Sequence, residues 1–290
     1  MGWNVNGELE KMGKCRKTVR KFTHVADNCN TKIIILIRCN SQWCPSCRSK
    51  RDRAMLPKVE KLIRSFQRPT KLELTLPSMK SLAEMRKLIK MCFAKLQRKK
   101  IWKDYVRAGI WGIGLTFSHE KGWHYHIHVA VDTWKYWPWQ KVAAAWSDIT
   151  GGAMIGTPER IKSVKGYAAE IIQGSRKGGK RDWETLDVIF SDPSRGKAVR
   201  DEVMTALHNA RFFQTFGKAS LEKKPEKIPM VCPACGAHFN IRDWIIEVVS
   251  LESVNREMFN GSAGSLQYYS RFESKYQRWK PPPDYERRVA

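Results

Sequence analysis

The chain has 290 residues, of which 53 are Lys or Arg and 28 are Asp or Glu, so its formal net charge at pH 7 is +25. Hydrophobic residues make up 42% of the sequence, which is enough for a packed core in one sizeable domain or two small ones. No apolar run approaches the roughly 20 residues that a membrane-spanning helix needs, and residues 33–37, among the longest such runs, have the length of a strand. The first residues lack a basic stretch followed by an apolar one, so we expect no signal peptide, no membrane partner and a cytoplasmic location.

The positive charge is spread along the chain and interleaved with aromatic residues. Basic clusters occur at residues 48–51, 98–100 and 176–181. Such a field attracts polyanions, and the release of their counterions adds affinity at low salt. Aromatic side chains can also stack on bases. The composition therefore favours a nucleic-acid partner over a protein that is merely basic.

The sequence divides into four regions by composition. They are a cysteine-rich basic segment over residues 1–60, alternating strand and helix patterns over residues 65–175, a Gly/Lys/Arg linker followed by a helical segment over residues 176–220, and a Cys-x-x-Cys pair with a basic, aromatic, Pro-rich tail over residues 221–290. The composition of that tail is typical of disordered segments.

The second region begins with a strand and a helix. Residues 71–76 alternate polar and apolar side chains, which predicts a half-buried strand that ends at Pro77. Apolar residues then recur at helical spacing over residues 82–96.

A hairpin and two further helices are expected next. Residues 110–118 and 123–132 read as strands joined by a turn, and residues 139–149 read as a helix. A last helix is expected to begin at Thr157, a capping hydroxyl followed by proline, and to continue through Ile171.

Three of the seven histidines lie in the second strand of the hairpin. His124, His126 and His128 alternate with apolar residues, so their imidazoles share one face while the opposite face is core. Two imidazoles two residues apart can bind one cation. The alternative is a solvent-facing strand that carries histidines by chance, and the shared register favours a metal site.

Three closely spaced cysteines suggest a zinc site. Cys39, Cys44 and Cys47 supply three thiolates, whereas tetrahedral zinc binds four ligands. Cys29 is the nearest candidate for the fourth, with Cys15 and His24 as rivals. Buried free thiols are the alternative, and the spacing favours zinc.

A second pair of cysteines lies far along the chain. Cys232 and Cys235 look like half of a zinc ribbon, with no second pair after them. They are either a remnant or are completed by Cys15 and Cys29. Cys92 falls on the apolar face of its helix and is expected in the core.

Several segments resemble, in order, the rolling-circle replication initiators of plasmids and small phages, which are HUH endonucleases. The most specific is Gly-Trp-His-Tyr-His-Ile-His-Val at residues 122–129, which resembles their His-hydrophobic-His motif. The weaker likenesses are to their N-terminal cysteine segment, their first strand motif and the run that leads to their catalytic tyrosine, at residues 39–51, 72–75, 145–146, 151–152 and 164–169. The resemblance covers roughly residues 39–172.

The resemblance implies an antiparallel five-stranded sheet flanked by helices. Together with the cysteines and the basic tail, this predicts an α+β fold with a zinc-binding N-terminal segment and a basic C-terminal extension. The resemblance also implies Mg or Mn on the sheet, and cleavage of single-stranded origin DNA that leaves a 5′-phosphotyrosine and a free 3′-hydroxyl. Duplex origin DNA and a host polymerase would also be partners. The sequence has no phosphate-binding Gly-x4-Gly-Lys-Ser/Thr loop, so we expect a host helicase rather than a built-in one.

Related functions remain open beside that one. Single-tyrosine transposases and conjugative relaxases share the same chemistry. A protein of a different class, a zinc-dependent nucleic-acid-binding protein without catalysis, also fits the composition. The sequence does not indicate an oligomeric state.

The resemblance assigns the catalytic metal to His126 and His128, and His124 could complete its shell. Family members often carry a glutamate on the preceding strand, where this chain has Gly114. Glu73 is the substitute, because alternation places it on the histidine side if the strands are neighbours. The alternative is a rim carboxylate paired with the nearby Lys71.

The resemblance assigns the nucleophile to Tyr167, which otherwise reads as a tyrosine at the margin of the core. Tyr125, Tyr136 and the tyrosines of the tail are the other candidates. Where the family usually has a lysine three residues later, this chain has Glu170, a possible general base. The expected DNA-binding side chains are those of Arg48, Arg51, Lys162 and Lys165.

Overall fold

The computed structural model describes residues 4–25, 29, 32–134, 137–153, 155–174, 184–191, 197–221, 232, 235–236, 244–259 and 266–268. The chain forms two compact units. One consists of residues 1–5 and 45–222, the other of residues 6–44 and 223–290. These limits differ from the four expected regions, because residues 45–60 share a unit with the sheet and the C-terminal region shares one with residues 6–44.

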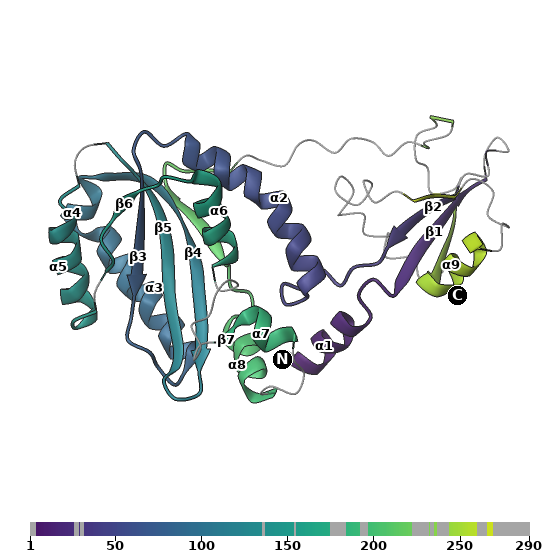
Figure 1. The fold of residues 1–290 in the computed structure, drawn as a ribbon, viewed down its shortest axis with the longest axis horizontal. Coiled ribbons are helices and arrows are strands. Elements are labelled where there is room, and N and C mark those ends of the chain that lie inside the picture. Colours follow the sequence, from purple (N-terminus) through teal and green to yellow (C-terminus); the bar gives the residue numbers. More distant parts are fainter. Residues whose placement is uncertain are drawn as a thin grey trace. The chain divides into compact units, whose positions relative to one another are not determined.

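The larger unit is built on one antiparallel sheet (Figure 1). Its main path runs β6-β3-β5-β4-β7, and β8 pairs with another stretch of β4, so the sheet is five strands wide. This confirms the α+β class and the five-stranded antiparallel sheet. The strands are β3 (Pro69–Thr75), β4 (Val106–Ser118), β5 (Gly122–Thr133), β6 (Glu159–Arg160), β7 (Glu184–Thr185) and β8 (Phe213–Gly217).

Helices cover both faces of this sheet. Figure 1 shows α2 (Pro45–Arg64) and α6 (Val164–Gln173) over one face and α3 (Leu82–Arg98) across the other. The expected helix over residues 82–96 is confirmed, with its first turn capped by Ser81. The other helices of this unit are α4 (Lys100–Lys103), α5 (Trp139–Thr150), α7 (Leu186–Ser191) and α8 (Lys197–Ala206).

The helix that carries Tyr167 begins later than the sequence suggested. Its N-cap is Ser163, whose hydroxyl oxygen accepts a hydrogen bond from the Gly166 amide, 3.2 Å away. The expected start at Thr157 is wrong because residues 159–160, which would lie in the first turn of that helix, form β6 and pair with β3. Tertiary pairing with a sheet edge therefore outweighs a local capping signal.

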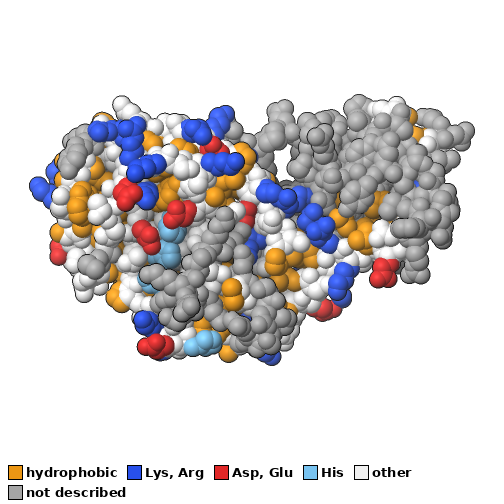
Figure 2. Space-filling view, in the orientation of Figure 1, with side chains coloured by type: hydrophobic (Ala, Val, Ile, Leu, Met, Phe, Trp, Pro, Cys, Tyr) orange, Lys and Arg blue, Asp and Glu red, His pale blue; other side chains and the backbone are white. Residues whose placement is uncertain are grey.

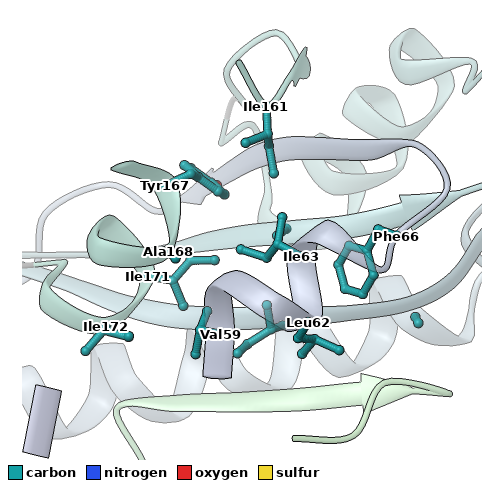
Figure 3. Close-up of a cluster of buried hydrophobic side chains, with 12 residues drawn as sticks. Val59, Leu62, Ile63, Phe66, Ile161, Tyr167, Ala168, Ile171 and Ile172 are labelled. Atoms are coloured by element: carbon teal, nitrogen blue, oxygen red, sulfur yellow. The ribbon is translucent and has the colours of Figure 1, made fainter. Parts of the chain in front are cut away.

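An apolar cluster packs α2 and α6 against the sheet. Figure 3 shows Ile63 and Val59 of α2 against Ala168 and Ile171 of α6, with Tyr167 beside them. Each of these side chains is buried. The position of α6 over the sheet is thus determined by core packing.

The smaller unit has its own four-stranded sheet, in the order β10-β2-β1-β9. Its elements are α1 (Val5–Gly13), β1 (Thr18–His24), β2 (Lys32–Leu36), β9 (Trp244–Ser250), α9 (Leu251–Phe259) and β10 (Leu266–Tyr268). The region expected to be a Cys-x-x-Cys segment and a tail thus contributes two strands and a helix. The tail residues 269–290 lie outside the described residues. Across the described parts of both units, no helix combines the length and the apolar composition needed to cross a bilayer.

Candidate functional site

Two imidazoles of β5 converge on one point. His126 and His128 lie on the sheet face beneath α6, and their Nε2 atoms are 3.0 Å apart. Burial lowers the pKa of His126 to about 3 and that of His128 to about 4, and repulsion from neighbouring imidazoles adds to the effect on His126. Both rings are therefore neutral at pH 7, and a neutral imidazole has one nitrogen lone pair that can bind a cation.

Glu73 supplies a carboxylate at the same point. β3 and β5 are neighbours, and their register pairs Glu73 with His128. One carboxylate oxygen, Oε1, lies 3.7 Å from His126 Nε2, and the three side chains form a group whose ligand atoms all lie within 4.8 Å of one another. Lys71, the expected alternative partner, instead has an ion pair with Glu159 at 3.0 Å. Burial and the charge of Glu170 raise the pKa of Glu73.

The three ligand atoms lie close enough together to bind one cation. Ligands about 2.1 Å from an octahedral cation such as Mg or Mn are about 3.0 Å from their nearest neighbours in the shell. The 3.0 Å separation of the two Nε2 atoms matches that edge, whereas the 3.7 Å between Glu73 Oε1 and His126 Nε2 is longer. Carboxylate oxygens suit Mg and Mn, whereas imidazole nitrogens also suit zinc and other transition metals.

Two glycines of β4 make room for this arrangement. A Cβ at Gly114 would overlap the His126 ring at Nε2, so a glutamate at this position, as the family resemblance expects, would not fit beside it. A Cβ at Gly112 would overlap the main chain of Ile171 in α6. The missing side chains thus allow both the ring position and the close approach of the helix.

Glu170 acts on the site through His128. Its Oε1 lies 3.1 Å from His128 Nδ1, the nitrogen that faces away from the shared point. A carboxylate in this position accepts the Nδ1 proton and leaves the Nε2 lone pair for a metal, a common arrangement around metal-binding histidines. The sequence suggested a general base, whereas the contact gives Glu170 a positioning role. Burial raises its pKa.

His124 is not part of the converging group. Its ring centroid is 5.1 Å from that of His126, and only Glu73, His126 and His128 meet the distance limit of the group. Alternation places His124 on the same face, but one position further along the strand. The expectation that His124 completes the shell is therefore not supported by the geometry.

Tyr167 lies on α6 with its hydroxyl buried. The hydroxyl donates a hydrogen bond to the carbonyl oxygen of Val129 at 3.1 Å, and the carbonyl oxygen of Leu72 is 3.4 Å away. Burial and the charge of Glu170 raise the pKa of Tyr167 well above its usual value. In this conformation the phenol is protonated and bound to the sheet backbone, which fits the core-margin alternative better than an exposed nucleophile.

The other tyrosines considered from the sequence do not replace it. Tyr125 lies on the opposite face of β5 and is fully buried. Burial raises the pKa of its hydroxyl. Tyr136 lies outside the described residues.

Four cysteines form a cluster that fits structural zinc. Cys15, Cys39, Cys44 and Cys47 place their sulfurs within 4.8 Å of one another. The favoured fourth ligand, Cys29, is wrong for this cluster, because Cys15 occupies that place. Spacing along the chain favoured the nearer cysteine, but the fold after α1 brings Cys15 to the other three.

The remaining expected zinc ligands form a separate group. Cys29, Cys232 and Cys235 lie together with His24, all four ligand atoms within 4.8 Å of one another. Cys15 is not among them. The expected core position of Cys92 is confirmed by its burial in α3.

Three of the four expected DNA-binding side chains are on the surface. Arg51, Lys162 and Lys165 are exposed, whereas Arg48 is only 6% exposed and does not present its charge to a ligand. Arg48 is buried because it lies on the inner side of the first turns of α2. Figure 2 shows histidine and acidic side chains next to one another over the sheet, with basic side chains around them.

Comparison of the chain with known protein families, with curated proteins and with solved structures found no match.

Proposed function

We propose that the larger unit is a metal-dependent nicking and joining endonuclease for single-stranded DNA. The observation that supports it best is the convergence of Glu73, His126 and His128 on one point, with ligand atoms close enough together to bind one cation. The likeness of residues 122–129 to the HUH motif supports the same reaction, and within it a role as a rolling-circle replication initiator.

The residues around the site have different roles in the proposed reaction. When bound, Mg or Mn would neutralise a non-bridging phosphate oxygen and orient the phosphorus for in-line attack. Glu170 keeps the proton of His128 on Nδ1, so that its Nε2 remains a ligand. Exposed Lys162 and Lys165, beside the start of α6, would attract the flanking phosphates of the strand.

Tyr167 is the proposed nucleophile, and it must first release its hydrogen bond to Val129. The phenol oxygen then forms a bond to phosphorus while the bond to the 3′ oxygen breaks. The phenol loses its proton and the leaving 3′ oxygen gains one, so no further reactant is needed. The 5′-phosphotyrosine keeps the energy of the bond for rejoining.

A hydrolase that uses water at the same site is the second candidate. The buried, hydrogen-bonded hydroxyl of Tyr167 favours it, because a water molecule needs no rearrangement of α6. This reaction would leave a free 5′-phosphate and no protein adduct.

One experiment separates these reactions. The full chain is incubated with a library of single-stranded oligonucleotides and Mn, and the products are resolved under denaturing conditions. We expect a covalent protein–DNA adduct that is absent in Tyr167→Phe and in His126→Ala, and retained in the control Tyr105→Phe. Cleavage with free 5′-phosphates and no adduct would favour the hydrolase. DNA binding without cleavage across the whole library would contradict both and leave a binding protein.

A further inference from the structure

The smaller unit brings four potential metal ligands together from two distant segments. His24 ends β1 and Cys29 follows it, whereas Cys232 and Cys235 precede β9. Cys29 and Cys232 are 203 residues apart in the chain, yet their sulfurs are 3.7 Å apart. His24 Nδ1 lies 3.6 Å from the sulfur of Cys235.

Both distances match the edges of a zinc tetrahedron. With Zn–S bonds of about 2.3 Å, two sulfurs of a tetrahedral site are about 3.8 Å apart. With a Zn–N bond of about 2.0 Å, sulfur and nitrogen are about 3.5 Å apart, close to the observed 3.6 Å. A disulfide, in contrast, needs sulfurs about 2.05 Å apart. The four cysteine and histidine side chains are therefore spaced as ligands around a common centre.

The surroundings of the group hold its members in place. His24 is 1% exposed and stacks on Trp244 with ring centroids 4.6 Å apart, and the two residues are paired across β1 and β9. The backbone turn of the Cys232–Cys235 pair closes with a 2.8 Å hydrogen bond from the Gly236 amide to the Cys232 carbonyl. Gly236 has a φ of +73°, a conformation that glycine adopts without strain.

We propose that His24, Cys29, Cys232 and Cys235 form a second structural zinc site, separate from the cluster of Cys15, Cys39, Cys44 and Cys47. The site joins the end of β1 to the segment before β9, and so holds β9 to the hairpin of β1 and β2. Such a link stabilises a small sheet, because metal binding free energy contributes directly to folding. This proposal is independent of the nuclease reaction.

The unmodified chain gives the first test. The protein is purified under reducing conditions, its zinc is measured by mass spectrometry, and its thiols are then alkylated before and after chelation. We expect about two zinc ions per chain, one for each cysteine cluster. Cys29, Cys232 and Cys235 should react together, and at least about tenfold faster once the metal is removed, because a metal-bound thiolate is withheld from the reagent.

Variants assign the ligands. His24→Ala should lose about one zinc ion, whereas His24→Cys should keep it, because Nδ1 is the ring nitrogen nearer the backbone and a thiolate can take its place. Cys39→Ser is the matched control, since it should lose the zinc of the other cluster and leave Cys29, Cys232 and Cys235 protected.

Two results would overturn the proposal. One is an unchanged zinc content in both His24→Ala and Cys232→Ser. The other, seen in the unmodified protein even if a variant fails to fold, is rapid alkylation of Cys232 and Cys235 that chelation does not alter.

Discussion

Glu170 Oε1 lies 3.1 Å from His128 Nδ1, so a carboxylate of α6 is placed to accept a hydrogen bond from one nitrogen of a β5 imidazole. The contact connects the helix that bears Tyr167 to the proposed metal site on the sheet.

Removal of this contact should weaken metal binding. We expect Glu170→Ala to lower the affinity for Mn about 10- to 100-fold, as is typical when the carboxylate behind a metal-binding histidine is lost. Isothermal titration calorimetry measures the change. Glu120→Ala, at an exposed position in the β4–β5 turn, is the control and should bind Mn like the unmodified chain. Equal Mn affinities in the two variants would show that Glu170 does not contribute to metal binding.

A methyl group at Gly114 should also disable the site. In Gly114→Ala the new Cβ would overlap the His126 ring, so the ring must move away from its present position. We expect loss of Mn binding and of cleavage. Gly156→Ala is the matched control, because no atom lies within 4 Å of its Cβ and its φ is not in the left-handed region. Full Mn binding by Gly114→Ala would show that the ring position is not needed.

The histidine pair should make the stability of the protein depend on pH. The pKa is lowered to about 3 in His126 and about 4 in His128, from an unfolded value of about 6.5. Between these values the unfolded chain binds more protons, so the stability from the neutral pair is present above about pH 6.5 and is lost as the pH falls toward 4.

Urea unfolding at pH 7 and pH 4.5, without Mg or Mn, measures this effect. The unmodified chain should lose more stability on acidification than His126→Asn/His128→Asn, by on the order of a few kcal/mol. The comparison cancels losses that both proteins share, such as release of zinc. Equal losses would mean that the two imidazoles titrate normally in the folded protein.

The hydroxyl of Tyr167 should contribute to stability in the absence of DNA. Tyr167→Phe removes a buried hydrogen bond to Val129, and we expect the free energy of unfolding to fall by about 0.5–1.5 kcal/mol. Thermal or urea unfolding checks this. An unchanged or higher stability would indicate that the Tyr167 hydroxyl does not form this hydrogen bond in the folded protein.

Cys15 should be required for zinc in the first cluster. Cys15→Ser is expected to lose about one zinc ion and to expose Cys39 and Cys44 to alkylation, since the four sulfurs lie together. Cys92→Ala, at a buried position outside both clusters, should keep its zinc. Retention of both zinc ions in Cys15→Ser would contradict this, and Cys29 would again be a candidate for the fourth ligand.

Much of the site was predictable because its signals are local. Alternation along residues 123–132 places His126 and His128 on one face, and the same rule applied to residues 71–76 places Glu73 beside them once the strands pair. The helix over residues 82–96 follows from its apolar spacing, which packing against the sheet preserves.

The rest depends on contacts between distant parts of the chain. The pairing of β6 with β3 moves the start of α6 to Val164, and nothing near Thr157 in the sequence indicates that pairing. The spacing of the cysteines along the sequence did not indicate that His24 lies beside Cys235, which is 211 residues away. The contact between Glu170 and His128 depends on how closely α6 approaches β4 at Gly112, which the sequence alone did not indicate.

The most direct test of the metal site is an electron paramagnetic resonance titration of the zinc-loaded chain with Mn. Glu73, His126 and His128 predict one bound Mn per chain, lost in His126→Ala/His128→Ala and weakened in Glu73→Gln. Equal Mn binding by the unmodified chain and the double-histidine variant would contradict the account.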